Sequence, residues 1–122
     1  MKWNGVRTGC AIVLFFVFAA VTGAEEKWSN WMFTNNGYIE WRWIAHTYGP
    51  DIPPNCNYEF RNKLNGTAQF KYVAGYSWLE RGIADQKKGV AYEITATNHG
   101  GDSIDKCTRV GSMTVSDLKI TN

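Results

Sequence analysis

Apolar and polar residues alternate with a period of two along much of the chain, and no long stretch repeats its apolar positions with the helical period of 3.6. Residues 38–46 are the clearest case, because Ile39, Trp41 and Trp43 share one face while polar residues such as Glu40 fall on the other. This alternation is typical of a β-strand that buries one face. We therefore expect Trp41 and Trp43 to lie in the core.

Further strand-like runs follow at short spacing, at residues 28–33, 56–61, 67–76, 78–84, 90–97 and 106–120, the last of them interrupted near Gly111. Short strands separated by turn signals predict an all-β fold. The sequence favours a small antiparallel immunoglobulin-like β-sandwich with one disulfide, formed by residues 25–122 as a single domain. A small β-barrel is the alternative.

Four segments are predicted to connect these strands. Asn65-Gly66 is a hairpin signal, so residues 56–61 and 67–76 are expected to pair as neighbours. Residues 47–55 hold all three prolines of the chain, which predicts a rigid connection, since proline fixes φ and lacks a backbone donor. The polar residues 86–89 predict a turn, and 98–105 a loose loop.

Residues 1–24 have the layout of a secretory signal peptide. Lys2 and Arg7 precede an apolar run at 11–21, and small residues lead to a predicted cleavage site after Ala24. The run has eleven residues, whereas a membrane-spanning helix needs about 20. We expect a secreted protein, extracellular or, in a Gram-negative bacterium, periplasmic, with no membrane span after cleavage.

Charge gives no support for a nucleic-acid partner. The whole chain carries a formal net charge of +2. Loss of Lys2 and Arg7 with the signal peptide leaves eleven basic and eleven acidic residues, and so a net charge of zero. A neutral domain has no long-range field that would attract a polyanion.

Cysteine usage predicts one structural disulfide. Cys10 lies in the predicted signal peptide, which leaves Cys56 and Cys107 as a pair in an oxidising compartment. The bridge would close a loop of 52 residues, which the chain-entropy model values at roughly 4 kcal/mol. A redox or zinc role fits poorly, since the chain has no Cys-x-x-Cys and His46 and His99 follow no ligand spacing.

Aromatic residues are the most prominent candidate binding groups, at 15% of the chain. Flat aromatic faces stack on sugar rings and also dominate protein–protein hot spots. The residues near the terminus or in loops are the better surface candidates. The predicted ligand-binding residues are Trp28, Trp31, Tyr48 and Trp78.

Other candidate chemistry is weak. No serine lies in a nucleophile-elbow pattern, so we expect no catalytic residues and no enzyme. His99, Asp102 and Asp105 are interpreted as a solvated loop, with no metal or cofactor expected. Asn65 begins an N-glycosylation sequon, Asn65-Gly66-Thr67, which is usable only in a eukaryote.

The sequence therefore favours a secreted, non-enzymatic interaction module that binds another protein or itself in a surface or extracellular assembly. Residues 25–36 are suited to pairing with the sheet edge of a neighbouring molecule. One alternative is a carbohydrate-binding module that uses Trp28, Trp31 and Trp78. The other is a small secreted inhibitor or effector that presents the rigid loop 48–55.

Overall fold

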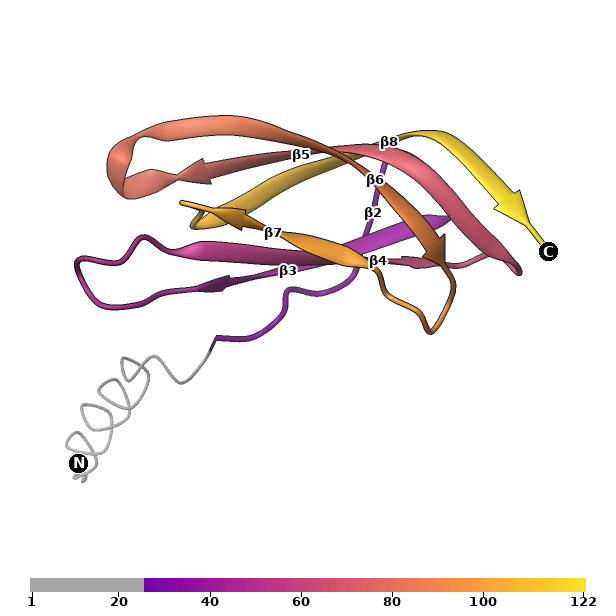
Figure 1. Ribbon diagram of the computed structural model, residues 1–122, viewed down its shortest axis with the longest axis horizontal. Coiled ribbons are helices and arrows are strands. Elements are labelled where there is room, and N and C mark those ends of the chain that lie inside the picture. Colours follow the sequence, from indigo (N-terminus) through magenta and orange to yellow (C-terminus); the bar gives the residue numbers. More distant parts are fainter. Residues whose placement is uncertain (1–25) are drawn as a thin grey trace, which may run out of the picture.

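The computed structural model describes residues 26–122 and confirms the all-β class: two antiparallel sheets pack face to face as a sandwich (Figure 1). The predicted signal peptide and its cleavage site lie outside the described residues. Within 26–122, no helix is long and apolar enough to cross a bilayer.

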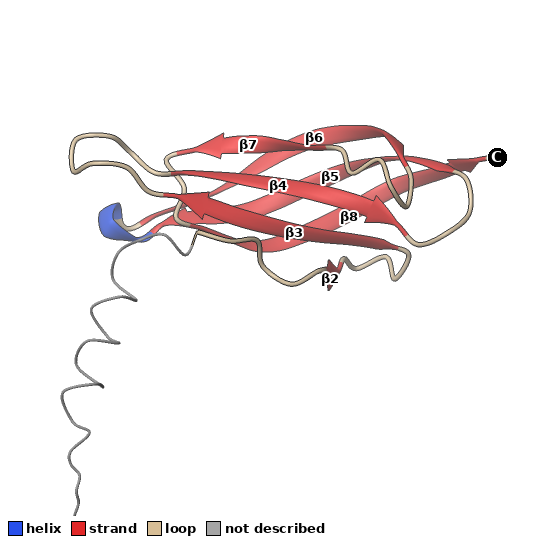
Figure 2. Ribbon diagram, turned by 90° about the horizontal axis from the view of Figure 1, so that it is seen from below, coloured by secondary structure: helices blue, strands red, loops and turns tan. Residues whose placement is uncertain are grey.

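The first sheet has the strand order β2-β3-β4-β7, and the second has the order β6-β5-β8 (Figure 2). The strands are β2 (Met32–Phe33), β3 (Ile39–His46), β4 (Asn55–Asn62), β5 (Thr67–Trp78), β6 (Ile83–Ile94), β7 (Gly101–Asp105) and β8 (Arg109–Thr121). Immunoglobulin constant domains place their first, second, fourth and fifth strands in one sheet. The likeness to them therefore lies in the two-layer architecture and not in the strand order.

The predicted hairpin across Asn65-Gly66 is wrong, because β4 and β5 belong to different sheets. The connection between them crosses the sandwich and is organised by the buried amide of Asn62. This amide donates to the Gly66 carbonyl at 3.2 Å and accepts from the Leu64 N–H at 2.9 Å. Asn65, the start of the sequon, is exposed on this connection.

The hairpin partner of β5 is β6, and the turn between them replaces the strand predicted at 78–84. A short 3₁₀ helix, η1 (Leu79–Arg81), is closed by Gly82, whose φ of +64° is a conformation that favours glycine. The residues 86–89 that predicted a turn lie inside β6 instead. They are polar because β6 is an edge strand, and the Lys87 amine donates to Asp102 Oδ2 on β7 at 2.9 Å.

A strand also replaces part of the loop predicted at 98–105, since β7 pairs with the first half of β4. Gly101 permits this pairing, because any side chain there would overlap the backbone of Tyr58 and Glu59. The alternation signal is weak here because only Ile104 of β7 is buried.

Aromatic rings fill the core between the sheets. Phe60 packs edge-on against Phe70 with ring centres 5.1 Å apart, and the Tyr58 and Tyr72 hydroxyls share a buried hydrogen bond of 2.6 Å. Burial raises the pKa of Tyr58 far above its usual value. Trp41 is buried as expected, and Trp43 packs against the core while partly exposed.

The predicted disulfide between Cys56 and Cys107 is confirmed. Cys56 lies near the start of β4, and Cys107 lies where the chain crosses from β7 to β8; both are fully buried. The Cys107 N–H also donates to the Pro54 carbonyl at 3.0 Å. The bridge therefore holds the first sheet to the crossing segment that leads to the second.

Replacing both bridged cysteines by alanine should lower the free energy of unfolding by roughly 4 kcal/mol, because the unfolded chain then regains the freedom of the open loop. Urea denaturation of the oxidised protein and of the C56A/C107A variant measures the difference. An unchanged denaturation midpoint would contradict a stabilising role for the bridge.

Candidate functional site

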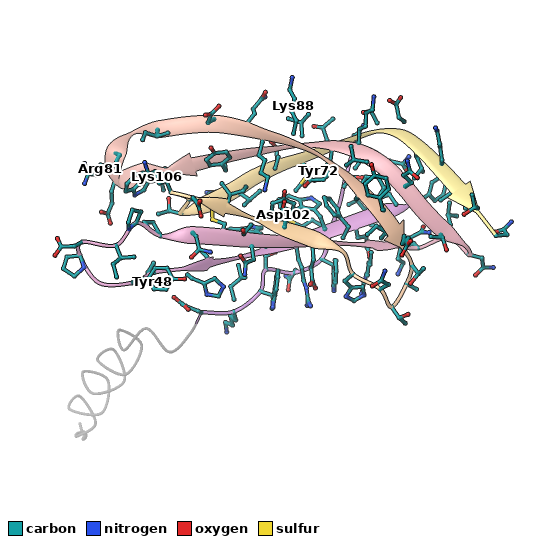
Figure 3. All side chains as sticks on the ribbon, viewed as in Figure 1. Tyr48, Tyr72, Arg81, Lys88, Asp102 and Lys106 are labelled. Atoms are coloured by element: carbon teal, nitrogen blue, oxygen red, sulfur yellow. A yellow bond between two sulfur atoms is a disulfide. The ribbon has the colours of Figure 1, made fainter. Side chains whose placement is uncertain are left out.

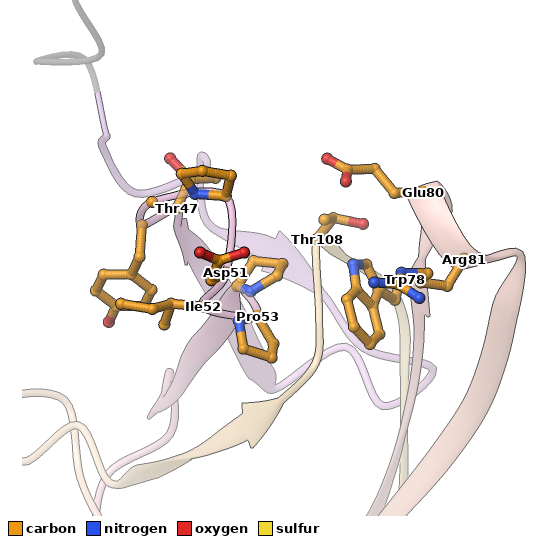
Figure 4. A pocket seen from close by; sticks show the side chains of 12 residues that line it. Thr47, Asp51, Ile52, Pro53, Trp78, Glu80, Arg81 and Thr108 are labelled. Carbon is orange, nitrogen blue, oxygen red and sulfur yellow. The ribbon is translucent and has the colours of Figure 1, made fainter.

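A crevice of about 300 Å³ opens at one end of the sandwich, where the β3–β4 connection faces the β5–β6 turn (Figure 4). Residues 47–54 line one wall, and Trp78, Glu80, Arg81 and Thr108 line the other. Two of the four predicted ligand-binding residues, Tyr48 and Trp78, are brought together here from positions 30 residues apart.

The first wall is rigid. It contains all three prolines, and the Ile52 N–H donates to the Gly49 carbonyl at 3.1 Å to close a turn. The Tyr48 hydroxyl donates to Asn55 Oδ1 at 2.7 Å, which fixes the ring at the crevice mouth. The end of this wall is held by the hydrogen bond that the Cys107 N–H donates to the Pro54 carbonyl. A ligand would meet this wall already in place.

The second wall is built on the end of β5. Thr108 Oγ1 accepts from the Leu79 N–H at 3.0 Å and donates to the Ser77 carbonyl at 3.1 Å, so it ties β8 to the turn after Trp78. The Arg81 guanidinium carbon lies 5.3 Å from the centre of the Trp78 ring, within cation–π range.

The indole nitrogen of Trp78 is buried and has no hydrogen-bond partner, the one side-chain atom of residues 26–122 in that condition. In Figure 4 it lies on the side of the ring toward Thr108. A buried donor without an acceptor costs about 1–3 kcal/mol.

Charged groups complete the lining. Asp51, Glu80 and Arg81 contribute two carboxylates and a guanidinium beside the aromatic rings. Of the described lining residues none is histidine, cysteine, serine or lysine, so the crevice holds no nucleophile with an adjacent imidazole base. The arrangement is suited to binding through aromatic contact and hydrogen bonds.

Asp51, Glu80, Arg81 and Thr108 were not among the predicted site residues. A signal for one of them was present, because Thr108 follows a cysteine whose partner, Cys56, lies just beyond the proline-rich loop. A predicted bridge between those cysteines already places Thr108 near that loop.

Trp28 and Trp31 lie elsewhere, over the outer face of the first sheet. The Arg42 guanidinium is 4.7 Å from the Trp28 ring centre and 4.5 Å from that of Trp31, and Arg61 is 4.3 Å from Trp31. The ring of His99 meets Trp31 edge-on at 5.0 Å. Both tryptophans therefore contact side chains of their own chain.

The two arginines beneath these rings are held by ion pairs between β3 and β4. Arg42 contacts Glu59 at 2.6 Å, and Arg61 contacts Glu40 at 2.6 Å. Both strands carry Glu before Arg in chain order, and because the strands are antiparallel each charge faces its opposite.

The segment 25–36, where the structure describes it, pairs with its own sheet. Met32 lies opposite Trp41 in β3, and the Ser29 N–H donates to the Trp43 carbonyl at 2.8 Å. The segment thus joins the first sheet, with β2 as an edge strand, and pairing of its open side with a neighbouring molecule stays a prediction.

The loop residues His99, Asp102 and Asp105 do not converge. His99 Nδ1 lies 3.6 Å from Glu59 Oε1, whereas Asp102 binds Lys87, whose hydrogen bond lowers the pKa of that carboxyl. Across residues 26–122 no group of three histidine, cysteine or acidic side chains is placed to hold a metal ion.

No protein-family model matches the sequence, and no curated protein does. Comparison with solved structures finds a similarity to the trimeric lipoprotein SadB of Salmonella enterica, with 11% sequence identity and a TM-score of 0.40. The match covers 91% of this chain and 72% of that one. A similarity at this level assigns no function.

One carboxylate joins the N-terminal segment to the crevice wall and should make that contact pH-dependent. Glu26 Oε2 accepts from the Thr47 N–H at 2.7 Å, and this bond, with a smaller contribution from His46, holds the pKa of Glu26 below its usual value of 4.5. A lowered carboxyl pKa stabilises the contact above pH 4.5 and loses that effect as pH falls through the lowered pKa.

Amide hydrogen exchange at Thr47 should therefore accelerate, relative to the intrinsic rate, when the pH falls well below 4.5. Glu26→Gln should remove this extra acceleration, since the amide oxygen does not titrate. Equal protection of Thr47 at neutral and acid pH in the unaltered protein would contradict the assignment.

Proposed function

We propose that the protein is an exported, non-enzymatic interaction module that binds another protein, and that the end crevice receives part of that partner. The observation that carries this proposal is the crevice itself, in which a proline-rich wall with an exposed Tyr48 faces Trp78 and Arg81.

The surroundings of the crevice support a protein ligand. Tyr48 and Ile52 are 55% and 57% exposed beside it, so they offer apolar contact area without further rearrangement. Tryptophan, tyrosine and arginine are the residues most enriched in interface hot spots, and Trp78, Tyr48 and Arg81 supply one of each. A wall fixed by prolines and a disulfide loses little conformational entropy on binding.

Export and the absence of catalysis are parts of the same proposal. The layout of residues 1–24 supports export, as does the buried disulfide, because such bridges persist in oxidising compartments. The crevice lining supports a binding role, because its residues lack an activated nucleophile.

A carbohydrate ligand is the second candidate. The crevice places aromatic rings beside two carboxylates, a guanidinium and the hydroxyls of Thr47 and Thr108, a set that can also meet the apolar faces and hydroxyls of a sugar. Trp78 and Tyr48 would carry this role, since they line the crevice whereas Trp28 and Trp31 do not.

Trp78→Phe should weaken capture of the partner about tenfold, because the smaller ring gives up part of the aromatic contact area that this wall of the crevice offers. The oxidised protein is immobilised and exposed to its own extracellular fraction and, in parallel, to insoluble polysaccharides. Trp28→Phe is the matched control and should leave capture unchanged.

The two ligand classes give different results in this experiment. A protein captured by the unaltered chain and lost with Trp78→Phe supports the interaction module. Retention on one polysaccharide, competed by its soluble oligomer and lost with the same variant, supports the carbohydrate module. Equal capture by both tryptophan variants would show that the crevice is not the binding site.

A further inference from the structure

One open edge of the sandwich is β6, a strand of 12 residues. It pairs with β5 on one side, and ten of its twelve residues are outside the core. The opposite edge of the same sheet is covered at its middle, because the Asn35 side chain donates to the Val115 carbonyl and accepts from the Val115 N–H, at 3.0 and 2.6 Å. An exposed edge is a template for another strand.

The two hydrogen bonds between Asn35 and Val115 of β8 also allow us to infer which backbone groups of β6 face its open edge. Both backbone groups of Val115 point away from β5, and Val115 lies opposite Tyr72. In an antiparallel ladder Tyr72 must then direct its own N–H and C=O toward β6, where it lies opposite Gly89. Gly89 and every second residue from it therefore bond to β5.

The residues between them, Ala84, Gln86 and Lys88, consequently direct their N–H and C=O groups to the open edge. The Gln86 N–H confirms this direction, because it donates to the side chain of Asp85 at 2.8 Å instead of to β5. The side chain of Lys88 points away from the two sheets (Figure 3).

The charges along this edge are self-complementary in one register. Two copies related by a twofold axis pair residues of the same face, and Gln86 opposite Gln86 sets Asp85 opposite Lys87 twice. The adjacent registers set Lys87 against Lys87 or Asp85 against Asp85, and like charges directly opposite each other are destabilising.

We propose that β6 pairs with β6 of a second copy of this chain, antiparallel and with Gln86 opposite Gln86. The two three-stranded sheets then form one continuous sheet. Gln86 exchanges two N–H···O bonds with its counterpart, and Ala84 exchanges two with Lys88 on either side. Ile83, 42% exposed, is set against Gly89 of the second copy.

The side chains of Lys87 and Asp85 are already placed for contacts between the two copies. Lys87 donates to Asp102 and to the Ser103 carbonyl, which leaves one of its three protons for Asp85 of the second copy. Asp85 accepts from the Gln86 N–H in the single copy and is released when the Gln86 carbonyl of the second copy accepts that hydrogen bond instead.

A cysteine cross-link tests the register. In a background with Cys10→Ser, the native bridge occupies the other two cysteines, so Gln86→Cys adds a single free thiol. Hydrogen-bonded partners have Cα atoms about 5.5 Å apart, within disulfide range, so mild oxidation should give a covalent dimer. In the matched variant Ala84→Cys the two thiols are four residues apart along the strands, about 13 Å, and should not link.

Sedimentation velocity tests the association without a cross-link. The unaltered protein should show a concentration-dependent dimer. Asp85→Lys, which sets amines against Lys87, should raise the dissociation constant about tenfold. Asp105→Lys makes the same charge change on β7, away from the pairing, and should leave it unchanged.

A monomer at all concentrations, equal cross-linking of the two cysteine variants, or an equal effect of the two lysine variants would each overturn the proposal. The paired residues of β6 share no member with the crevice lining. The dimer and the crevice are therefore tested separately, and failure of one leaves the other standing.

Discussion

The bridge between Cys56 and Cys107 is the constraint on which the arrangement of this molecule depends. It joins the start of β4 to the point where the chain leaves one sheet for the other. The two segments beside the bridged residues, ending at Pro54 and beginning at Thr108, are also opposite walls of the crevice. The width of the crevice is therefore set by a covalent bond and the adjacent Cys107–Pro54 hydrogen bond, and ligand binding need not order it.

The two sheets of this sandwich are not joined by strand pairing along their sides, as they would be in a closed barrel. Polar side chains make the contacts at these two sides instead. Lys87 joins β6 to Asp102 on β7 at one side, and Asn35 binds the edge of β8 at the other. Lys87 interrupts the apolar alternation of β6 for a structural reason, since the carboxylate that it binds lies on the other sheet.

This polar closure explains where the sequence could and could not predict the fold. Residues 38–46 and 56–61 were correctly placed as strands because apolar residues at alternate positions of each pack against the core, and the disulfide followed from a single available pair. The polar run around Lys87 resembled a turn because its partner, Asp102, is remote in sequence. Asn65-Gly66 marked a turn correctly but could not identify which strand pairs with β5, because long-range packing decides that.

The same distinction applies to the tryptophans. Local sequence places Trp28, Trp31 and Trp78 alike near chain ends or turns, yet Trp31 finds arginines on β3 and β4 while the Trp78 indole N–H finds no acceptor. The position of a tryptophan in the sequence therefore does not show which contacts its ring makes, because those contacts come from strands that are remote in the chain. A dimer joined at β6 would carry two such crevices, neither of them built from paired residues. A partner with repeated epitopes could then be held at both, and linked sites bind far more tightly than either alone.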